Sequence, residues 1–146
     1  MSVQIRPATL ADKSAWLAMR QALWPDATDL EEEIDHQFER LAFQAWLALE
    51  GNQTIGFAEA SIRPFANGCD SQPVAFLEGI WVAEAQRKQG VGRALVATVE
   101  TCAKAQGILE LGSDTWLHDT RSQTVHGHWG FEETERVVYF RKKLSA

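Results

Sequence analysis

The sequence has few cysteines and no long apolar run, and both shortages exclude classes of protein. Cys69 and Cys102 are its only cysteines, which gives neither a disulfide framework nor the spacing of a metal-ligand set. No stretch approaches the ~20 consecutive apolar residues of a membrane-spanning helix. The N-terminal residues 1–7 lack the apolar core of a signal peptide. We therefore expect a cytoplasmic protein with reduced thiols, no membrane partner and no metal.

Basic residues are also scarce. Lys and Arg number 14 against 20 Asp and Glu, which leaves a net charge of −6. This balance makes nucleic acid an unfavourable partner, because contacts to phosphates need a basic face. The 146 residues are 45% hydrophobic, which suffices for one domain with a core of its own. No repeat, linker or low-complexity tract divides the chain, so we expect a single domain over residues 1–146.

One stretch, residues 74–99, joins a strand pattern to a helix pattern through a glycine-containing loop. Strand alternation puts Phe76, Ile80 and Val82 on one face with Glu78 among them. The apolar stripe of the helix consists of Val91, Leu95, Val99 and Cys102. The loop, residues 86–92, is partly basic and opens the helix, where N–H groups and the positive end of the helix dipole face outwards. These features predict an anion site suited to a pyrophosphate.

The spacing of the glycines narrows the kind of anion site. A P-loop is excluded because no Gly-Lys-Ser/Thr follows the glycines, and the dinucleotide fingerprint lacks its third glycine. The arrangement Arg87-x-x-Gly90-x-Gly92 after a strand resembles the acyl-CoA-binding motif of the GCN5-related N-acetyltransferase superfamily. The alternative is an ordinary glycine-containing turn before a surface helix.

The other elements follow the order of that superfamily, β-α-α-β-β-β-α-β-α-β, so we expect a mixed-sheet α/β (α+β) fold. Capping residues and apolar spacing predict helices from Thr9 to Trp24 and over 30–41. Alternation and turn residues predict a hairpin over 45–62, a buried strand over 108–113 and a last strand over 137–140. Between these last two strands, residues 121–129 form a helix that ends at a glycine.

Within the superfamily, several runs closely resemble the aminoglycoside 6′-N-acetyltransferases of type I. They are Trp24-Pro25, Asn67-Gly68-Cys69-Asp70, Phe76-Leu77-Glu78-Gly79-Ile80, Ser113-Asp114-Thr115 and Gly130-Phe131-Glu132-Glu133-Thr134-Glu135-Arg136. The resemblance implies transfer of the acetyl group of acetyl-CoA to the 6′-amine of an aminoglycoside by direct attack in a ternary complex, which confers antibiotic resistance. It also implies a homodimer.

The resemblance further implies a CoA site along the central strand and the loop. A backbone N–H there, in first place that of Val82, would polarise the thioester carbonyl. Asp119 stands where many relatives carry a CoA-contacting Asn. The implied CoA-binding residues are Ile80, Trp81, Val82, Arg87, Lys88, Gln89, Gly90, Val91, Gly92, Arg93 and Asp119.

Three residues are candidates for proton transfer. Asp114 follows a buried strand at its carboxyl end and is the first choice for handling the proton of the amine, with Glu78 second. Asp114 could instead cap a helix or form a turn, and Glu78 could instead pair with a neighbouring Arg. His126 occupies the position of the usual tyrosine acid of the family. A histidine can donate a proton near neutral pH, or it can be a bystander near CoA.

A polycationic substrate calls for carboxylates and an aromatic wall. The substrate-binding candidates are Trp24, Phe65, Asp70, Glu78, Asp114 and Glu135. Phe65 stands where similar enzymes carry Tyr, and Trp24 could simply close the first helix against the core. The acid run Glu31-Glu32-Glu33 either lines the cleft or only compensates a helix dipole.

Two further functions remain open from the sequence. The enzyme could acetylate another cationic amine, such as a polyamine, a peptide or a small metabolite. The domain could also be a CoA-binding module without turnover, since His126 replaces the tyrosine and Asp119 the asparagine of the family.

Overall fold

The computed structural model describes residues 2–39 and 42–145. They group into two compact units, residues 2–114 and residues 115–145. Each unit is described by itself. Across these described ranges, every helix is too short or too polar to cross a bilayer.

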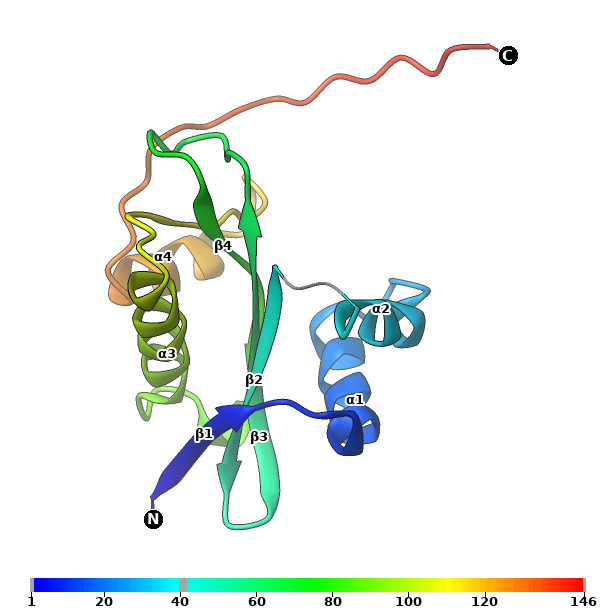
Figure 1. Cartoon of the computed structure of the whole chain (residues 1–146), viewed down its shortest axis with the longest axis vertical. Helices are drawn as coiled ribbons and strands as arrows, with labels where there is room; N and C mark the ends of the chain where they lie inside the picture. Colours follow the sequence, from blue (N-terminus) through cyan, green and yellow to red (C-terminus); the bar gives the residue numbers. More distant parts are fainter. Residues whose placement is uncertain (1, 40–41, 146) are drawn as a thin grey trace. The chain divides into compact units, whose positions relative to one another are not determined.

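The first unit is built on a five-stranded sheet in the order β1-β2-β3-β4-β5 (Figure 1). Each pair of neighbours is antiparallel except β4 and β5, which are parallel. The predicted hairpin is confirmed, with its turn at residues 51–52. The strands are β1 (Val3–Pro7), β2 (Phe43–Glu50), β3 (Gln53–Arg63), β4 (Val74–Val82) and β5 (Leu111–Gly112).

Three α-helices cover this sheet, α1 and α2 on one face and α3 on the other (Figure 1). Their bounds are Lys13–Leu23 for α1, Leu30–Gln37 for α2 and Val91–Ala105 for α3. Short 3-10 turns at Leu10–Asp12 and Glu84–Gln86 lead into α1 and towards α3. All three helices were expected from the sequence, although Leu41, predicted at the end of the second, lies outside the described residues.

The predicted helix start at Thr9 is confirmed, and it takes the form of a capping box with Asp12. Asp12 accepts a hydrogen bond from the backbone N–H of Thr9 at 2.8 Å. Both oxygens of Asp12 also accept from Arg6 at 2.8 Å. The Arg6 guanidinium, helped by the Thr9 bonds, lowers the pKa of Asp12 to about 2. This pair fixes the chain where it leaves β1 and enters α1.

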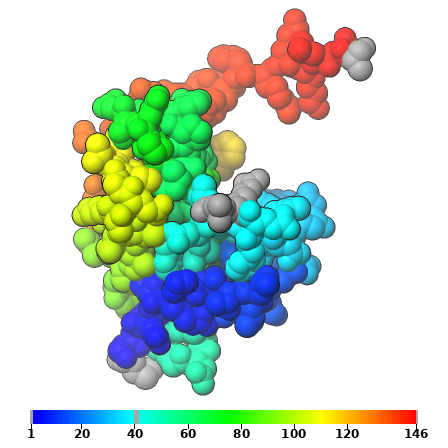
Figure 2. All heavy atoms as spheres, viewed as in Figure 1, coloured from blue at the N-terminus to red at the C-terminus, as the bar shows by residue number. Residues whose placement is uncertain are grey.

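The core between α1, α2 and the sheet is apolar and closely packed. Trp16, Ile34, Leu47 and Phe57 are at most 1% exposed. In the space-filling view the residues of α1 and α2, drawn in blue and cyan, lie against one another as one surface (Figure 2). Burial of these side chains positions the end of α1, which carries Trp24.

Strand β4 contains one extra residue. Its pairing with β3 is regular over residues 79–82 and again over 74–77. The register shifts between these two segments and leaves Glu78 without an opposite residue on β3. Such a β-bulge bends a strand and redirects a side chain, and bulges are frequent beside active sites.

The bulge overturns one sequence-based prediction, that Phe76, Ile80 and Val82 share a face. Arg63 of β3 covers the Phe76 ring and also binds Glu78, so Phe76 and Glu78 lie on one face. After the bulge the alternation restarts, which turns Ile80 and Val82 to the opposite face. The prediction assumed strict alternation of faces along the strand, and the extra residue Glu78 breaks that alternation.

The second unit contains one helix, α4 (Thr120–His128), as the sequence predicted. The prediction of a strand over residues 137–140 is wrong, because residues 131–145 form no strand. This segment runs as an extended chain, drawn in orange and red (Figure 1, Figure 2). Val138, Tyr139 and Phe140 are 73%, 73% and 93% exposed. A strand gains stability from a paired neighbour and from burial of one face, and this segment has neither within residues 115–145.

Candidate active site

The loop before α3 has the geometry of an anion site. Gly90 precedes the helix with a φ of 88° and Lys88 has a φ of 64°, so the chain turns twice through the left-handed region. The N–H groups of Val91 and Gly92 lie in the first turn of α3, where a helix provides no acceptor for them. The N–H of Arg87, one of the residues implied to bind CoA, already donates to Glu84 O at 3.3 Å, so this N–H is not available to the anion.

Among the described residues of the first unit, the edge of β4 that faces away from β3 is open over most of its length. Pairing with β5 covers only two residue pairs, and it ends at Phe76. The N–H of Ala83 donates to Ile55 O at 2.8 Å. Because hydrogen-bonded and non-bonded pairs alternate in an antiparallel ladder, the N–H groups of Ile80 and Val82 point away from β3.

The carbonyl of Val82 supports this orientation. It accepts a hydrogen bond from Arg87 Nε at 2.8 Å instead of one from β3. Arg87 thereby ties the start of the anion loop to the end of the open edge. The side chain of Trp81 packs into the core beside Trp16, so Trp81 contributes packing at this point.

A cavity of about 570 Å³ lies on the α1–α2 face of the sheet. It brings together Trp24 and Glu78 of the predicted substrate-binding set, with Glu33 of the acid run at its side. Phe65, which follows the lining residue Pro64, is 65% exposed. The full lining is Arg20, Trp24, Ala27, Leu30, Glu33, Gln37, Ala42, Phe43, Glu59, Ser61, Ile62, Arg63, Pro64 and Glu78.

Glu78 is held in place by β3. Arg63 donates from Nε to one carboxylate oxygen at 2.9 Å and from Nη2 to the other at 2.7 Å. Ser61 Oγ donates to the same carboxylate. The alternative reading of Glu78, as the partner of an arginine, is therefore confirmed as a contact. A carboxylate held by a two-pronged arginine is well oriented beside the cavity.

Trp24 forms one wall of the cavity. Its ring lies against Gly79 of the bulge and packs edge-on to Phe57 with ring centroids 6.4 Å apart. The Arg20 guanidinium lies 4.9 Å from the ring centroid, within cation–π range. The predicted packing role of Trp24 and its place in the cavity are thus compatible.

Polar side chains gather at the most buried part of the cavity. Glu59 is 1% exposed, accepts from Trp16 Nε1 at 2.7 Å and lies 3.4 Å from Arg20 Nη1. Burial raises the pKa of Glu59 to about 7, although Arg20, Trp16 and Gln37 each oppose the shift. Arg20 also lies 3.5 Å from Glu33.

Asp114 and Asp70 are both exposed. Asp114 follows β5 at its carboxyl end, as predicted, and the cap of the next helix is Asp119, so the helix-cap alternative for Asp114 is wrong. The backbone N–H of Asp70 donates to Glu110 Oε1 at 2.9 Å, and Ser71 adds two further bonds. These bonds fix the loop that carries Asp70 and lower the pKa of Glu110.

The second unit carries three predicted residues, His126, Asp119 and Glu135. His126 Nδ1 lies 2.8 Å from the carbonyl of Ser122, which can only accept, so Nδ1 carries a hydrogen. Asp119 Oδ1 accepts from the N–H of Ser122 at 3.0 Å and caps α4. Glu135 lies in the extended segment and is exposed.

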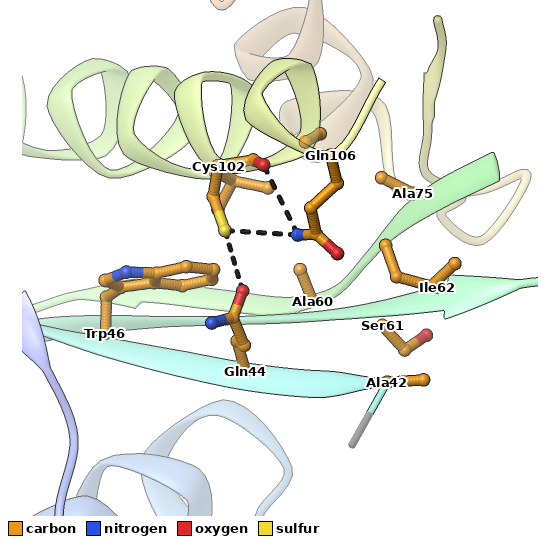
Figure 3. A pocket seen from close by; sticks show the side chains of 11 residues that line it. Ala42, Gln44, Trp46, Ala60, Ser61, Ile62, Ala75, Cys102 and Gln106 are labelled. Carbon is orange, nitrogen blue, oxygen red and sulfur yellow. Dashed lines mark hydrogen bonds between the residues drawn. The ribbon is translucent and has the colours of Figure 1, made fainter. Parts of the chain in front are cut away.

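A second, smaller cavity of about 110 Å³ lies on the other face of the sheet, under α3 (Figure 3). The Cys102 thiol points into it and donates to Gln44 Oε1 at 2.7 Å, and Gln106 Nε2 lies 3.4 Å from the sulfur. None of the predicted site residues lines this cavity. The two cavities share only Ala42, Ser61 and Ile62 at the end of the sheet, and the described lining of the smaller one contains no charged side chain.

The sequence did not reveal the partners of Glu78 and Glu33, or the buried acid Glu59 with its neighbours. Arg63, Arg20, Gln37 and Glu59 were not among its candidates. Glu59 gave a usable signal, since it is a lone acid in the apolar strand run 55–62. The others could not be found, because their role depends on which side chains meet across β3, α1 and α2.

The whole chain is similar to a well-defined group of proteins. Residues 14–131 match the family described as "Acetyltransferase (GNAT) family". A protein of Stenotrophomonas maltophilia named aminoglycoside N(6′)-acetyltransferase type 1 is 44% identical over 142 residues, 96% of this chain and 93% of the relative. One of the same name from Serratia marcescens is 46% identical over 136 residues, 89% and 92% of the two chains.

Solved structures agree with this similarity. That of AAC(6′)-Iy in complex with the bisubstrate analogue CoA-S-monomethyl-acetylneamine is 38% identical, with a TM-score of 0.94, over 99% of this chain and 100% of the other. That of the aminoglycoside 6′-N-acetyltransferase AAC(6′)-Ih from Acinetobacter baumannii is 39% identical, with a TM-score of 0.93 over the same shares.

Proposed function

Because this chain belongs to the acetyltransferase (GNAT) family, we propose that it transfers the acetyl group of acetyl-CoA to the 6′-amino group of aminoglycoside antibiotics and so confers resistance to them. The reaction is a direct attack of the amine in a ternary complex. The family match runs across both compact units, and we treat residues 1–146 as one acetyltransferase domain.

One observation carries this proposal: similarity to the named enzymes extends over 96% of the chain at 44% identity. The family match over residues 14–131 includes Trp24, Glu78 and the anion loop. The local chemistry agrees with it. An oriented carboxylate, Glu78, and an aromatic wall, Trp24, share a cavity of about 570 Å³. Such a cavity suits a cationic sugar, whose rings need aromatic contact and whose ammonium groups need acids.

The residues around the anion loop fit acetyl-CoA. The N–H groups at the start of α3 are placed for a pyrophosphate, and Lys88, Gln89 and Arg93 flank them. The open edge of β4 is placed for an extended arm that carries amide groups. Bound there, acetyl-CoA supplies the activated acetyl group, and the N–H of Val82 polarises its carbonyl oxygen.

The chain's own acids prepare the amine. Glu78 and Asp70 attract ammonium groups of the substrate, and Trp24 and Phe65 hold its ring faces. Asp114, at the carboxyl end of β5, takes the proton of the attacking amine directly or through water, with Glu78 as the second choice. Alignment of amine and thioester lowers the barrier by removing orientational freedom.

The leaving thiolate needs a proton. In this proposal His126 provides it: Nδ1–H stays bonded to Ser122 O, and the transferred proton leaves from Nε2. Asp119 combines its capping role with a contact to CoA. Glu135 completes the acidic surround of the substrate.

A homodimer and a cytoplasmic location belong to the same proposal. The dimer is supported by the apolar side chains that residues 137–140 leave exposed, which a second copy would cover. Location in the cytoplasm is supported by two unpaired cysteines. Sedimentation of the purified chain as a monomer at micromolar concentration would contradict the dimer.

The function is tested by mixing the purified protein with acetyl-CoA and a panel of amines while following release of free thiol. The panel contains kanamycin, tobramycin, an aminoglycoside with a hydroxyl at the 6′ position, spermidine and a lysine peptide. We expect turnover only on the drugs with a 6′-amine. Turnover on spermidine or the peptide alone would refute the substrate class and retain the CoA site. CoA binding without turnover would indicate a binding module.

A further inference from the structure

We propose that Arg20 and Gln37 form a hydroxyl-binding subsite at the buried end of the substrate cavity, and that it takes a ring hydroxyl of the aminoglycoside. The inference rests on the proposed function. It adds to that function a subsite that binds neutral groups of the substrate. Glu78 and its neighbours bind the ammonium groups.

Unpartnered polar atoms define the subsite. Arg20 Nε and Gln37 Oε1 are buried and make no hydrogen bond, and Arg20 Nη1 has only its ion-pair contact with Glu59 at 3.4 Å. Arg20 is 3% exposed and Gln37 9% exposed, and both line the cavity. Buried polar atoms in native proteins almost always find a partner, because each one left without a partner destabilises the fold. Two such atoms, on two side chains that line one cavity, point to a ligand that supplies the missing bonds.

The charges of the wall select the chemistry of that ligand. Arg20 is a cation with two carboxyl neighbours, Glu59 at 3.4 Å and Glu33 at 3.5 Å, and burial raises the pKa of Glu59 to about 7. An ammonium group placed directly against the guanidinium would meet the repulsion of a like charge. A ligand group that satisfies both side chains must accept a hydrogen bond from the Arg20 guanidinium and donate one to the amide oxygen of Gln37. A hydroxyl does both with a single oxygen.

The position of the subsite suits a sugar hydroxyl. Arg20 contacts the ring of Trp24, and Trp24 in turn lies on Gly79 next to Glu78. A substrate ring packed on Trp24 thus has a carboxylate and the Arg20–Gln37 pair within one cavity. The cavity is far larger than the roughly 30 Å³ that one water occupies, so it admits a sugar ring together with its hydroxyls.

The test uses three drugs that differ only in hydroxyls of the ring that carries the 6′-amine: kanamycin B, its 3′-deoxy form tobramycin, and its 3′,4′-dideoxy form dibekacin. For the wild-type protein we expect kcat/KM to fall about tenfold from kanamycin B to at least one deoxy drug, as the loss of one hydrogen bond to a charged group predicts. In Gln37→Met and in the double variant Arg20→Gln/Glu59→Gln, which removes both members of the ion pair, this difference should shrink to less than threefold.

The control is Gln44→Met, which removes a glutamine from the smaller cavity on the other face of the sheet. It should keep the wild-type difference between the drugs. Calorimetric Kd values for the same drugs test binding apart from turnover, and circular dichroism identifies a variant that fails to fold. Wild-type turnover with equal kcat/KM for all three drugs would overturn the subsite and leave the function standing. The same holds for a difference that both folded variants retain. Absence of turnover on every drug would overturn both.

Discussion

The ring of Trp24 lies directly on the backbone of Gly79, at a distance that leaves no room for a side chain. A Cβ at position 79 would lie 2.6 Å from Cη2 of Trp24 and 2.8 Å from Cζ2. The bulge residue Glu78 and the aromatic wall are therefore set by one contact. Trp24 can reach this place because α1 ends immediately before it, ahead of Pro25.

Gly79→Ala is expected to push Trp24 out of the cavity wall. Overpacking of this kind costs about 1–3 kcal/mol, so we expect the aminoglycoside KM to rise roughly tenfold. The KM for acetyl-CoA should stay unchanged, since Gly79 faces α1. Steady-state kinetics with each substrate varied in turn measures both values. An unchanged aminoglycoside KM would mean that Trp24 does not contact the substrate.

Gly90→Val should weaken the binding of acetyl-CoA. Gly90 has a φ of 88°, which a branched side chain adopts only with strain, and it opens the helix that holds the anion loop. We expect the acetyl-CoA KM to rise about tenfold with little change for the drug. Gly51→Val is the matched control: Gly51 also has a positive φ, 61°, but lies in the β2–β3 turn. Equal KM changes in both variants would reject the loop assignment.

Asp114→Asn should lower kcat by about a hundredfold, because the amide cannot accept the proton of the amine. Asp26→Asn, an exposed aspartate of the turn after α1, serves as the control and should match the wild type. Glu78→Gln keeps the shape of the carboxylate but weakens its bonds to Arg63, so it should raise the drug KM more than it lowers kcat. Full kcat in Asp114→Asn would remove Asp114 from proton transfer.

His126→Asn should change the pH dependence of kcat. A general acid acts only while it carries its proton, so the loss of this acid should change the shape of the kcat–pH profile in the variant. His128→Asn, in the same last turn of α4, is the control. Superimposable profiles for wild type and His126→Asn would exclude the acid role.

Glu59 should make the folded protein less stable as pH rises, because its pKa is raised on folding. Its pKa rises from an ordinary 4.5 to about 7 on folding, so the folded state holds its proton longer than the unfolded state. The stabilisation is complete below pH 4.5 and is lost as pH rises through about 7, by roughly 3 kcal/mol in all. Urea unfolding of wild type and Glu59→Gln at pH 5 and pH 7.5 measures this. A variant with the wild-type pH slope would contradict the assignment.

Most of the fold could be predicted from local patterns. The helix start at Thr9, the hairpin turn at residues 51–52 and the apolar stripe of α3 each depend on neighbours within a few residues, and each is confirmed. The last strand failed because alternation at residues 137–140 shows that a segment suits a sheet, not that a partner strand is available.

The candidate site was only half predictable. Glu78 and Trp24 were identified by type and by resemblance, and the structure brings both to one cavity. Their partners Arg63 and Arg20 come from other elements, so no spacing in the sequence connects them. The bulge was equally hidden: a Glu-Gly pair within a strand permits one, but only the pairing with β3 shows which residue is extra.

The bulge also makes β4 intolerant of any change in length. Removal of one residue near Glu78 would restore an unbroken ladder, and every side chain before or after that point would then turn to the wrong face. Trp81 would leave the core, or Phe76 would leave Arg63. A single substitution along the strand changes one side chain and leaves the others on their faces. A single-codon insertion or deletion there would turn a whole segment of side chains to the opposite face of the sheet. Evolution of new drug preferences at this strand is therefore confined to replacement of residues.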